Sequence, residues 1–311
     1  MFNSGEYTPH QPVLYQEIIS ALQPRNQGKY VDCTLGAGGH AWGILTTSSP
    51  DGMLLGLDLD PAALHLAQER LSIFGKRAIL MQASYITLLQ RMAEIGWNQV
   101  DGIVLDLGVS SMQLDQAERG FSFQEEGPLD MRFDPSQPVS AADLVNHCSE
   151  TDLANIIWQY GEEPRSRQIA RAICQARPLH TTAELADVIV KTIGKRKGGA
   201  HPATQTFQAL RIAVNQELTS VREVLPQAIQ ALSAGGRLAV IAFHSLEDRI
   251  VKQYFRQEST DCICPPGLPA CICGHKASLV EKPRHAIFPS EAEILINPRA
   301  RSARLRVVEK L

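Results

Sequence analysis

The stretch DCTLGAGGH at residues 32–40 decides the fold expected for this chain. It follows a short apolar run and places glycines in a tight turn just before a helical pattern. Two more apolar runs end in acids: LLGLDLDP at residues 54–61 and DGIVLDLGVSS at residues 101–111. The carboxyl ends of parallel strands form the ligand crevice of an open α/β sheet. The sequence therefore predicts one nucleotide-like pocket built by three successive strands.

Strands and helices alternate through the first third of the chain. Residues 30–32 and 53–58 read as strands, and Asp60 followed by Pro61 is typical of a helix start. The helix that follows carries apolar residues at core-facing spacing. This alternation is typical of a parallel, doubly wound sheet.

Helices without intervening strands follow this first part. Apolar residues recur at helical spacing near 153–160, 169–176 and 185–189, the last behind a capping box formed by Thr181 and Glu184. A long helix is expected from about residue 203 to 221, and the strand pattern resumes at 237–243. We therefore expect a sheet domain formed by residues 1–113 and 201–311, interrupted by an all-helical insertion at 114–200.

Composition sets limits on the class of protein. The net charge is -3 and the isoelectric point is near 6.3, so the whole chain carries no basic excess that would indicate nucleic acid. No apolar run is long enough to span a bilayer, and the amino terminus lacks a secretion pattern. Seven cysteines without such a signal argue against a disulfide framework. We expect a cytoplasmic protein with no membrane partner.

Two cofactors fit the glycine turn. Gly36, Gly38 and Ala41 match a dinucleotide fingerprint, with Asp58 about 20 residues downstream to bind a ribose. S-adenosylmethionine uses the same arrangement without a pyrophosphate. Asp106 favours S-adenosylmethionine, because a nicotinamide pocket has less use for an acid at that strand end. In a third interpretation, both aspartates only cap strand ends or helices.

The chain resembles the bacterial small-subunit ribosomal RNA N4-cytosine methyltransferases, the RsmH or MraW family, over essentially its whole length. Long motifs in one order carry this resemblance. They are HQPVL at 10–14, residues 32–40, DLGVSSMQLD at 106–115, ERGFSF at 118–123, GPLDMR at 127–132, HPATQTFQA at 201–209, FHSLEDR at 243–249 and NPRARS at 297–302.

The resemblance implies a class I, Rossmann-like methyltransferase sheet with a helical insertion. It also implies methyl transfer from S-adenosylmethionine to the exocyclic N4 of a cytosine in the decoding region of 16S ribosomal RNA. The expected partner is this RNA, within the small ribosomal subunit, and the expected assembly is a monomer or a homodimer. The cofactor-binding positions carried over are Gly38, Gly39, His40, Asp58, Tyr85, Asp106 and Gln113.

Asp106 is also the candidate catalytic residue, because a carboxylate that accepts hydrogen bonds from the amine could take its proton. The chain lacks the Pro-Pro-aromatic element that amino-methylating enzymes often carry at this point, so the proton acceptor stays open. His244 is a second candidate for substrate contact, with a helix cap as the alternative. The resemblance implies no catalytic metal.

Several residues could meet the RNA. Phe121, Phe123 and Arg132 could receive an unstacked base, although the phenylalanines could equally anchor the insertion. The basic run 195–199 and the group Arg299, Arg301, Arg304 and Arg306 could bind phosphates, with a solvated basic surface as the alternative.

The cysteine pairs Cys262-x-Cys264 and Cys271-x-Cys273 could bind zinc. Each pair has only one residue between its cysteines, which strains a shared tetrahedral site, so reduced thiols are the default expectation. Two other classes of function remain open: a nicotinamide-dependent oxidoreductase and an RNA-binding protein without catalysis.

Overall fold

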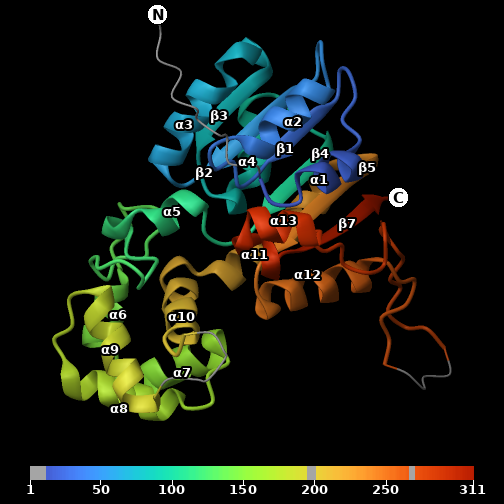
Figure 1. Cartoon of the computed structure of the whole chain (residues 1–311). Helices are drawn as coiled ribbons and strands as arrows, with labels where there is room; N and C mark the ends of the chain where they lie inside the picture. Colours follow the sequence, from blue (N-terminus) through green and yellow to red (C-terminus); the bar gives the residue numbers. More distant parts are fainter. Residues whose placement is uncertain (1–11, 195–200, 266–269) are drawn as a thin grey trace, which may run out of the picture. The chain divides into compact units, whose positions relative to one another are not determined.

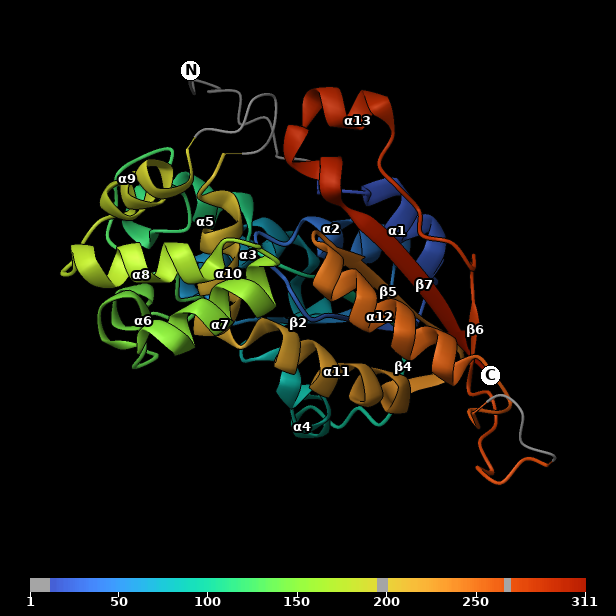
Figure 2. The same ribbon diagram turned by 90° about the horizontal axis from the view of Figure 1, so that it is seen from below.

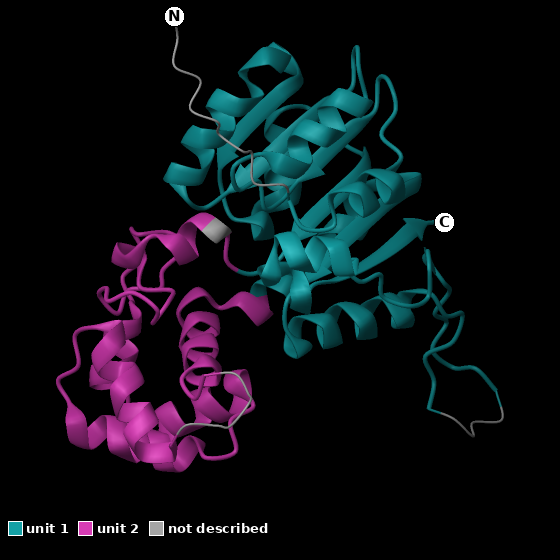
Figure 3. Cartoon of the chain, in the orientation of Figure 1, with its two compact units in different colours: residues 1–108, 220–311 teal, residues 109–219 magenta. Residues whose placement is uncertain are grey.

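The computed structural model describes residues 12–194, 201–265 and 270–311. His10, the basic run 195–199 and most of the loop between the cysteine pairs lie outside the described residues. The chain forms two compact units, residues 1–108 with 220–311 and residues 109–219 (Figure 3). We call them the sheet unit and the helical unit.

The sheet unit is built on seven strands in the order β3-β2-β1-β4-β5-β7-β6 (Figure 1). The first five are parallel, and β7 is antiparallel to both of its neighbours. The sheet is Rossmann-like, which confirms the predicted class I fold. The strands are β1 Lys29–Asp32, β2 Met53–Asp58, β3 Ala78–Gln82, β4 Val100–Asp106, β5 Leu232–Ala242, β6 Leu279–Glu281 and β7 Arg304–Lys310.

Helices cover both faces of this sheet because neighbouring strand residues point to opposite sides. Tyr30 packs with the core under α1, α2 and α3, whereas Val31 packs with the core under α4, α11 and α12. Figure 2 shows α11 and α12 along their face. The helices of this unit are α1 Tyr15–Leu22, α2 Gly39–Thr47, α3 Pro61–Leu71, α4 Leu88–Glu94, α12 Ser245–Glu258, α13 Glu291–Ile296 and, from residue 220 onward, α11 Glu217–Ala231.

Sequence signals explain the start of α3. The backbone N–H of Ala62 donates to the Asp60 carboxylate at 3.0 Å, and Pro61 is the first helical residue. An N-terminal proline loses no helical hydrogen bond there. The predicted cap is confirmed.

The helical unit has a hydrophobic core of its own, which includes Leu153, Ile157, Ile169, Leu185 and Leu210. It is larger than the expected insertion, because α10 packs against α7 and so belongs to it. The capping box of Thr181 and Glu184 is present, as predicted. The helices are α5 Ser111–Asp115, α6 Ala141–His147, α7 Glu150–Gly161, α8 Ser166–Ala176, α9 Thr182–Ile193 and α10 Thr204–Asn215.

The single long helix expected from residue 203 to 221 is wrong. Gln216 has a φ of 50°, in the left-handed region, and its backbone N–H caps α10 by donating to the Ile212 carbonyl. A new helix, α11, begins at Glu217. The apolar spacing continues across the break, which is why the sequence pattern did not reveal it.

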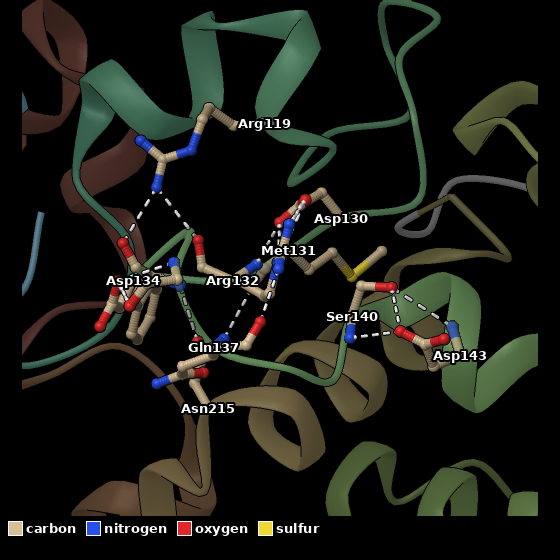
Figure 4. Close-up of polar contacts among 11 residues, drawn as sticks. Arg119, Asp130, Met131, Arg132, Asp134, Gln137, Ser140, Asp143 and Asn215 are labelled. Carbon is tan, nitrogen blue, oxygen red and sulfur yellow. Dashed lines mark hydrogen bonds and ion pairs between the residues drawn. The ribbon is translucent and has the colours of Figure 1, made fainter.

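A polar cluster holds the loop between α5 and α6 (Figure 4). The Asn215 side chain donates to the Met131 carbonyl at 2.7 Å and accepts from the Phe133 N–H at 2.8 Å. The Arg132 guanidinium donates to the Asp130 carboxylate, with Nη2 to Oδ2 at 2.6 Å. Met131 is fully buried and has a φ of 60°, an uncommon conformation for a side chain that size. These bonds impose the strained turn.

Gly161 marks a close approach of two helices, and we expect Gly161→Ala to destabilise the helical unit. A Cβ there would lie 2.5 Å from the Gln205 carbonyl oxygen. Alanine favours a helix by about 1 kcal/mol, but overpacking against rigid backbone costs about 1–3 kcal/mol. The clash should decide the sign, and urea unfolding measures it. Thr151→Ala, an exposed change on the same helix, is the control; a Gly161→Ala protein as stable as that control would contradict the packing argument.

Candidate functional site

Three aspartates lie at the carboxyl ends of adjacent strands in the sheet unit. Asp32 ends β1, Asp58 ends β2 and Asp106 ends β4. Because β1 pairs with β2 on one side and with β4 on the other, the three carboxyl groups share one edge of the sheet. This edge is where open α/β sheets bind their ligands.

Asp58 fixes the glycine turn to the second strand. Its Oδ2 accepts from the Gly36 N–H at 2.7 Å, and its Oδ1 accepts from the Asp60 N–H at 2.9 Å. Burial raises the pKa of this carboxyl in spite of these bonds. A carboxylate has about four acceptor positions, so it keeps capacity for the hydroxyl groups of a ribose.

Asp32 and Asp106 each have one buried carboxylate oxygen without a hydrogen-bond partner, Oδ2 and Oδ1 respectively. Burial raises the pKa of Asp32 to about 7. Burial, with the nearby carboxylates of Asp32 and Glu247, raises the pKa of Asp106 well above its usual range. Buried acceptors without partners are rare and costly. A ligand with a positively charged or hydrogen-bond-donating group would satisfy them, and the ammonium of S-adenosylmethionine is such a group.

His40 supplies no positive charge to these acids. Its Nε2 lies 3.0 Å from the Val13 carbonyl oxygen, so that nitrogen carries the hydrogen. Burial lowers the pKa of the ring to about 4. The neutral ring then turns the lone pair of Nδ1 toward Asp106 Oδ2, at 3.8 Å. His40 thus borders the acidic edge as a neutral group, and the protonated forms of the acids are favoured there until a ligand supplies positive charge.

The glycines of the turn are required by the local structure. Gly38 has a φ of 76°, which favours glycine. A Cβ on Gly39 would lie 2.2 Å from the Pro12 ring. Both positions therefore have a conformational or packing reason to be glycine, whatever ligand they meet.

Tyr85 lies in the sheet unit, whereas Gln113 lies in the helical unit. Tyr85 begins a short 3-10 helix, Tyr85–Thr87, just after β3, and packs half-buried against the core of the sheet unit. Gln113 belongs to the helical unit, where its Oε1 accepts from the Ser110 N–H at 3.0 Å in a capping box. The structure thus brings Gly38, Gly39, His40, Asp58 and Asp106 together around the glycine turn and the acidic edge.

Asp32 is the residue that the expected site omitted. The signal was present, because YVD at residues 30–32 ends an apolar strand in an acid, as the other two strands do. Its place in the glycine motif concealed this role, because the glycines dominate the pattern of that motif.

His244 is at the N-cap position of α12, but its side chain makes no capping bond. Its Nε2 lies 3.2 Å from Glu247 Oε1, and the Phe243 N–H donates to the other oxygen of Glu247 at 3.0 Å. His244 is thus the cap residue of the helix by its position, whereas its side chain is paired with Glu247. His201, in contrast, does fix a helix start, because its Nδ1 accepts from the Ala203 N–H at 3.2 Å.

The aromatic residues expected to receive a base lie in the helical unit. Phe121 is only 7% exposed in the core. Phe123 stacks on His201 at 4.5 Å between ring centroids and meets Phe207 edge-on. Arg132 is held by Asp130. All three stabilise the unit, so the expectation of free base-stacking groups is not supported.

The arginine group of the carboxyl-terminal segment divides in two. Arg304 and Arg306 donate to the Asp248 carboxylate, at 3.0 Å and 2.6 Å. Burial is the largest single effect on Asp248 and raises its pKa. The hydrogen bonds and charges of Arg306 and Arg304 together outweigh burial, so the pKa is lowered. Arg306 is thus committed to the sheet unit, contrary to the expected phosphate contact. Arg301 remains exposed.

Arg301 lines a pocket of about 370 Å³ in the sheet unit. Its other lining residues are Phe243, His244, Ser245, Phe288, Ser302 and Arg304. Phe288 is 60% exposed, which is high for a phenylalanine. The pocket joins an arginine, an exposed ring and His244, a combination that suits a nucleotide.

No helix within the described ranges is long and apolar enough to cross a membrane.

A family model described as the MraW methylase family matches residues 7–311. Three curated relatives share the name ribosomal RNA small subunit methyltransferase H. The protein from Dehalococcoides mccartyi is 54% identical over 303 residues, covering 97% of this chain and 87% of the relative. That from Citrifermentans bemidjiense is 53% identical over 307 residues, covering 97% and 98%. That from Thermomicrobium roseum is 48% identical over 307 residues, covering 98% and 94%.

We expect Asp32→Asn to stabilise the ligand-free protein, and increasingly so at higher pH. The folded protein keeps a proton on Asp32 up to pH of about 7, whereas the unfolded chain loses it near 3.8. Stability is therefore lost as the pH rises between these values, by up to roughly 4 kcal/mol. Asparagine does not ionise and avoids the loss.

Urea unfolding of both proteins across this pH range measures the difference, with Asp51→Asn, an exposed change, as the control. His40 acts in the opposite direction in both proteins, because its lowered pKa makes the fold more stable as the pH rises from about 4 to 6.5. Subtracting the two proteins removes that effect. A difference that does not grow with pH would refute the raised pKa of Asp32.

Proposed function

Because the chain belongs to the MraW methylase family, we propose that it methylates the exocyclic N4 of a cytosine in the decoding region of 16S ribosomal RNA. At the coarser level, the chain is a ribosomal RNA methyltransferase that uses S-adenosylmethionine. The base, the atom and the position are our proposal. So are the assembled small subunit as substrate, the cytoplasmic location and a monomeric or homodimeric enzyme.

The unsatisfied carboxylate oxygens of Asp32 and Asp106 carry the proposal. Together they offer a buried cradle for the ammonium group of the cofactor, whose positive charge would favour the ionised form of these acids over the protonated form that burial favours in the ligand-free protein. In the same scheme the oxygens of Asp58 bind the ribose hydroxyls, the glycine turn admits the cofactor beside its backbone, and the ring of Tyr85 covers the adenine. Gln113 is the remaining cofactor-binding residue of the proposal.

The bound cofactor would supply an electrophilic methyl group on a sulfonium. The amine of cytosine is a weak nucleophile because its lone pair is delocalised into the ring, so positioning of this amine is the main task of the protein. A carboxylate that accepts a hydrogen bond from the amine draws the lone pair out of conjugation and can take the proton after transfer. Asp106 is the candidate, since burial makes it a stronger base than an exposed aspartate.

The target base must leave its stack before its amine can be reached. The pocket of Arg301, Phe288 and His244 supports a nucleotide-binding role, because a guanidinium and an exposed ring can hold a phosphate and a base. We also propose that the helical unit, residues 109–219, recognises the RNA substrate. Within the proposed enzyme, His244 contacts substrate from this pocket.

The proposal predicts transfer of labelled methyl from S-adenosylmethionine to small ribosomal subunits that lack the modification. The product nucleoside should be N4-methylcytidine. Asp58→Ala should lose transfer and raise the Kd of the cofactor at least about 100-fold, the value of two charged hydrogen bonds. Asp51→Ala, an exposed aspartate, should match the parent protein.

Free 16S RNA and duplex DNA, tested in parallel, identify the acceptor. A different methylated nucleoside would overturn the N4 assignment. Tighter binding of NAD than of S-adenosylmethionine would favour the oxidoreductase alternative, and RNA binding with no transfer to any acceptor would favour a protein without catalysis.

We expect Arg301→Ala to weaken RNA binding about 5-fold and to lower the slope of log affinity against log salt by roughly 0.7–0.9, the loss of one phosphate contact. Arg256→Ala is the matched control. Arg256 is also exposed, but it lies near the carboxyl-terminal end of α12, whereas the pocket that Arg301 lines lies at the amino-terminal end of this helix. Binding titrations at several salt concentrations measure both slopes. An unchanged slope for Arg301→Ala would remove this arginine from the RNA surface.

A further inference from the structure

The segment between α12 and β6 has no helix or strand among its described residues. Its described residues, 259–265 and 270–278, project from the sheet unit in Figure 1. Its base is closed, because the Ser278 N–H donates to the Glu258 carbonyl at 2.8 Å and the Ala277 N–H donates to Asp261 at 3.2 Å. The segment is therefore a closed excursion rather than a loose connection.

Apolar burial does not hold the outer part of this excursion together. Ile263 is 45% exposed and Ile272 is 80% exposed. A connection this long whose described residues form no helix or strand is uncommon in a compact domain. Small structures that cannot bury a core are usually stabilised by disulfides or a metal.

Four cysteines meet in this outer part. The Sγ atoms of Cys262, Cys264, Cys271 and Cys273 all lie within 4.8 Å of one another. The sulfurs of Cys271 and Cys273 are 3.5 Å apart, and those of Cys273 and Cys262 are 3.9 Å apart. A tetrahedral zinc ion with Zn–S bonds of about 2.3 Å separates its sulfurs by about 3.8 Å. The separations of 3.5 Å and 3.9 Å lie on either side of that value, and the other sulfurs are near enough to close on one ion.

The backbone supports the sulfurs in a reciprocal pattern. The N–H of Ile263, which lies inside the first cysteine pair, points to Cys273 Sγ at 3.5 Å. The N–H of Ile272, inside the second pair, points to Cys264 Sγ at 3.4 Å. Each pair thus donates to a sulfur of the other, so two short Cys-Ile-Cys segments face each other. This arrangement removes the objection that one-residue spacing strains a shared site.

Backbone N–H donors favour the thiolate form that metals require. The N–H groups of Ile263 and Ile272 are such donors, and they point to the sulfurs of Cys273 and Cys264.

We propose that Cys262, Cys264, Cys271 and Cys273 bind one structural zinc ion that closes the excursion between α12 and β6. Four protein sulfurs leave no open position, which is typical of a structural site. The cluster follows the carboxyl-terminal end of α12, whereas His244 precedes its first residue, about 20 Å away along the helix. The zinc site thus lies at the other end of α12 from the pocket that His244 lines.

The full-length protein, purified without chelator, should contain about one zinc per chain by elemental analysis. The double variant Cys271→Ser/Cys273→Ser should lose at least about nine-tenths of this metal. Cys174→Ser, a half-buried cysteine of the helical unit, should retain it. Cobalt bound in place of zinc should give the intense visible bands of a tetrahedral tetrathiolate site in the parent and not in the double variant.

A second measurement does not depend on how well the double variant folds. Lys276 is exposed beside the cluster, and chelation of zinc from the parent should speed tryptic cleavage there about 10-fold or more, because local opening becomes easier. Adding zinc back should restore protection. Four free thiols without metal, two disulfides, iron in place of zinc, or cleavage unaffected by chelation would each overturn the proposal.

Discussion

The sheet unit depends on one constraint. Three carboxyl groups, at one edge of its parallel strands, are removed from water. The strands that carry Asp32, Asp58 and Asp106 are buried on both faces, so their acids end in a region of low dielectric. Backbone N–H groups satisfy Asp58, but one oxygen of each of the other two acids has no partner. The fold tolerates this cost at a place where a cationic ligand would repay it.

The helical unit is stabilised by a hydrophobic core of its own. Its helices need no contribution from the sheet to bury their apolar faces, since they share a core of their own. The loop that enters this unit is held by buried hydrogen bonds around Met131 and Asn215 instead of by regular structure. Arg132 and Phe121, which the sequence suggested for contact with RNA, instead stabilise this loop through a hydrogen bond to Asp130 and through burial.

Local signals in the sequence were sufficient for much of this architecture. Asp60 with Pro61, and Thr181 with Glu184, predicted helix starts because a cap involves residues only a few positions apart. The strands ending in acids likewise predicted the edge where Asp58 and Asp106 lie.

Long-range contacts are what the sequence could not supply. Asp248 meets Arg306 across 58 positions, and no periodicity indicates that pairing. The break at Gln216 was hidden because the apolar pattern runs through it, and the contact between Gly39 and Pro12 involves residues from different elements. The four cysteines came together because their backbones face each other, which spacing alone argued against.

The place of β7 in the sheet bears on the order in which the chain can be assembled during its synthesis. This strand is the last to be made, yet it lies between β5 and β6 and pairs with both. A nascent chain that has emerged only through α12 therefore exposes an unpaired edge on β5, a surface prone to association with other chains. The helical unit can fold in the meantime because its core is complete once residue 219 has emerged. Translation thus delivers a finished helical unit long before the sheet that flanks it in the sequence can close.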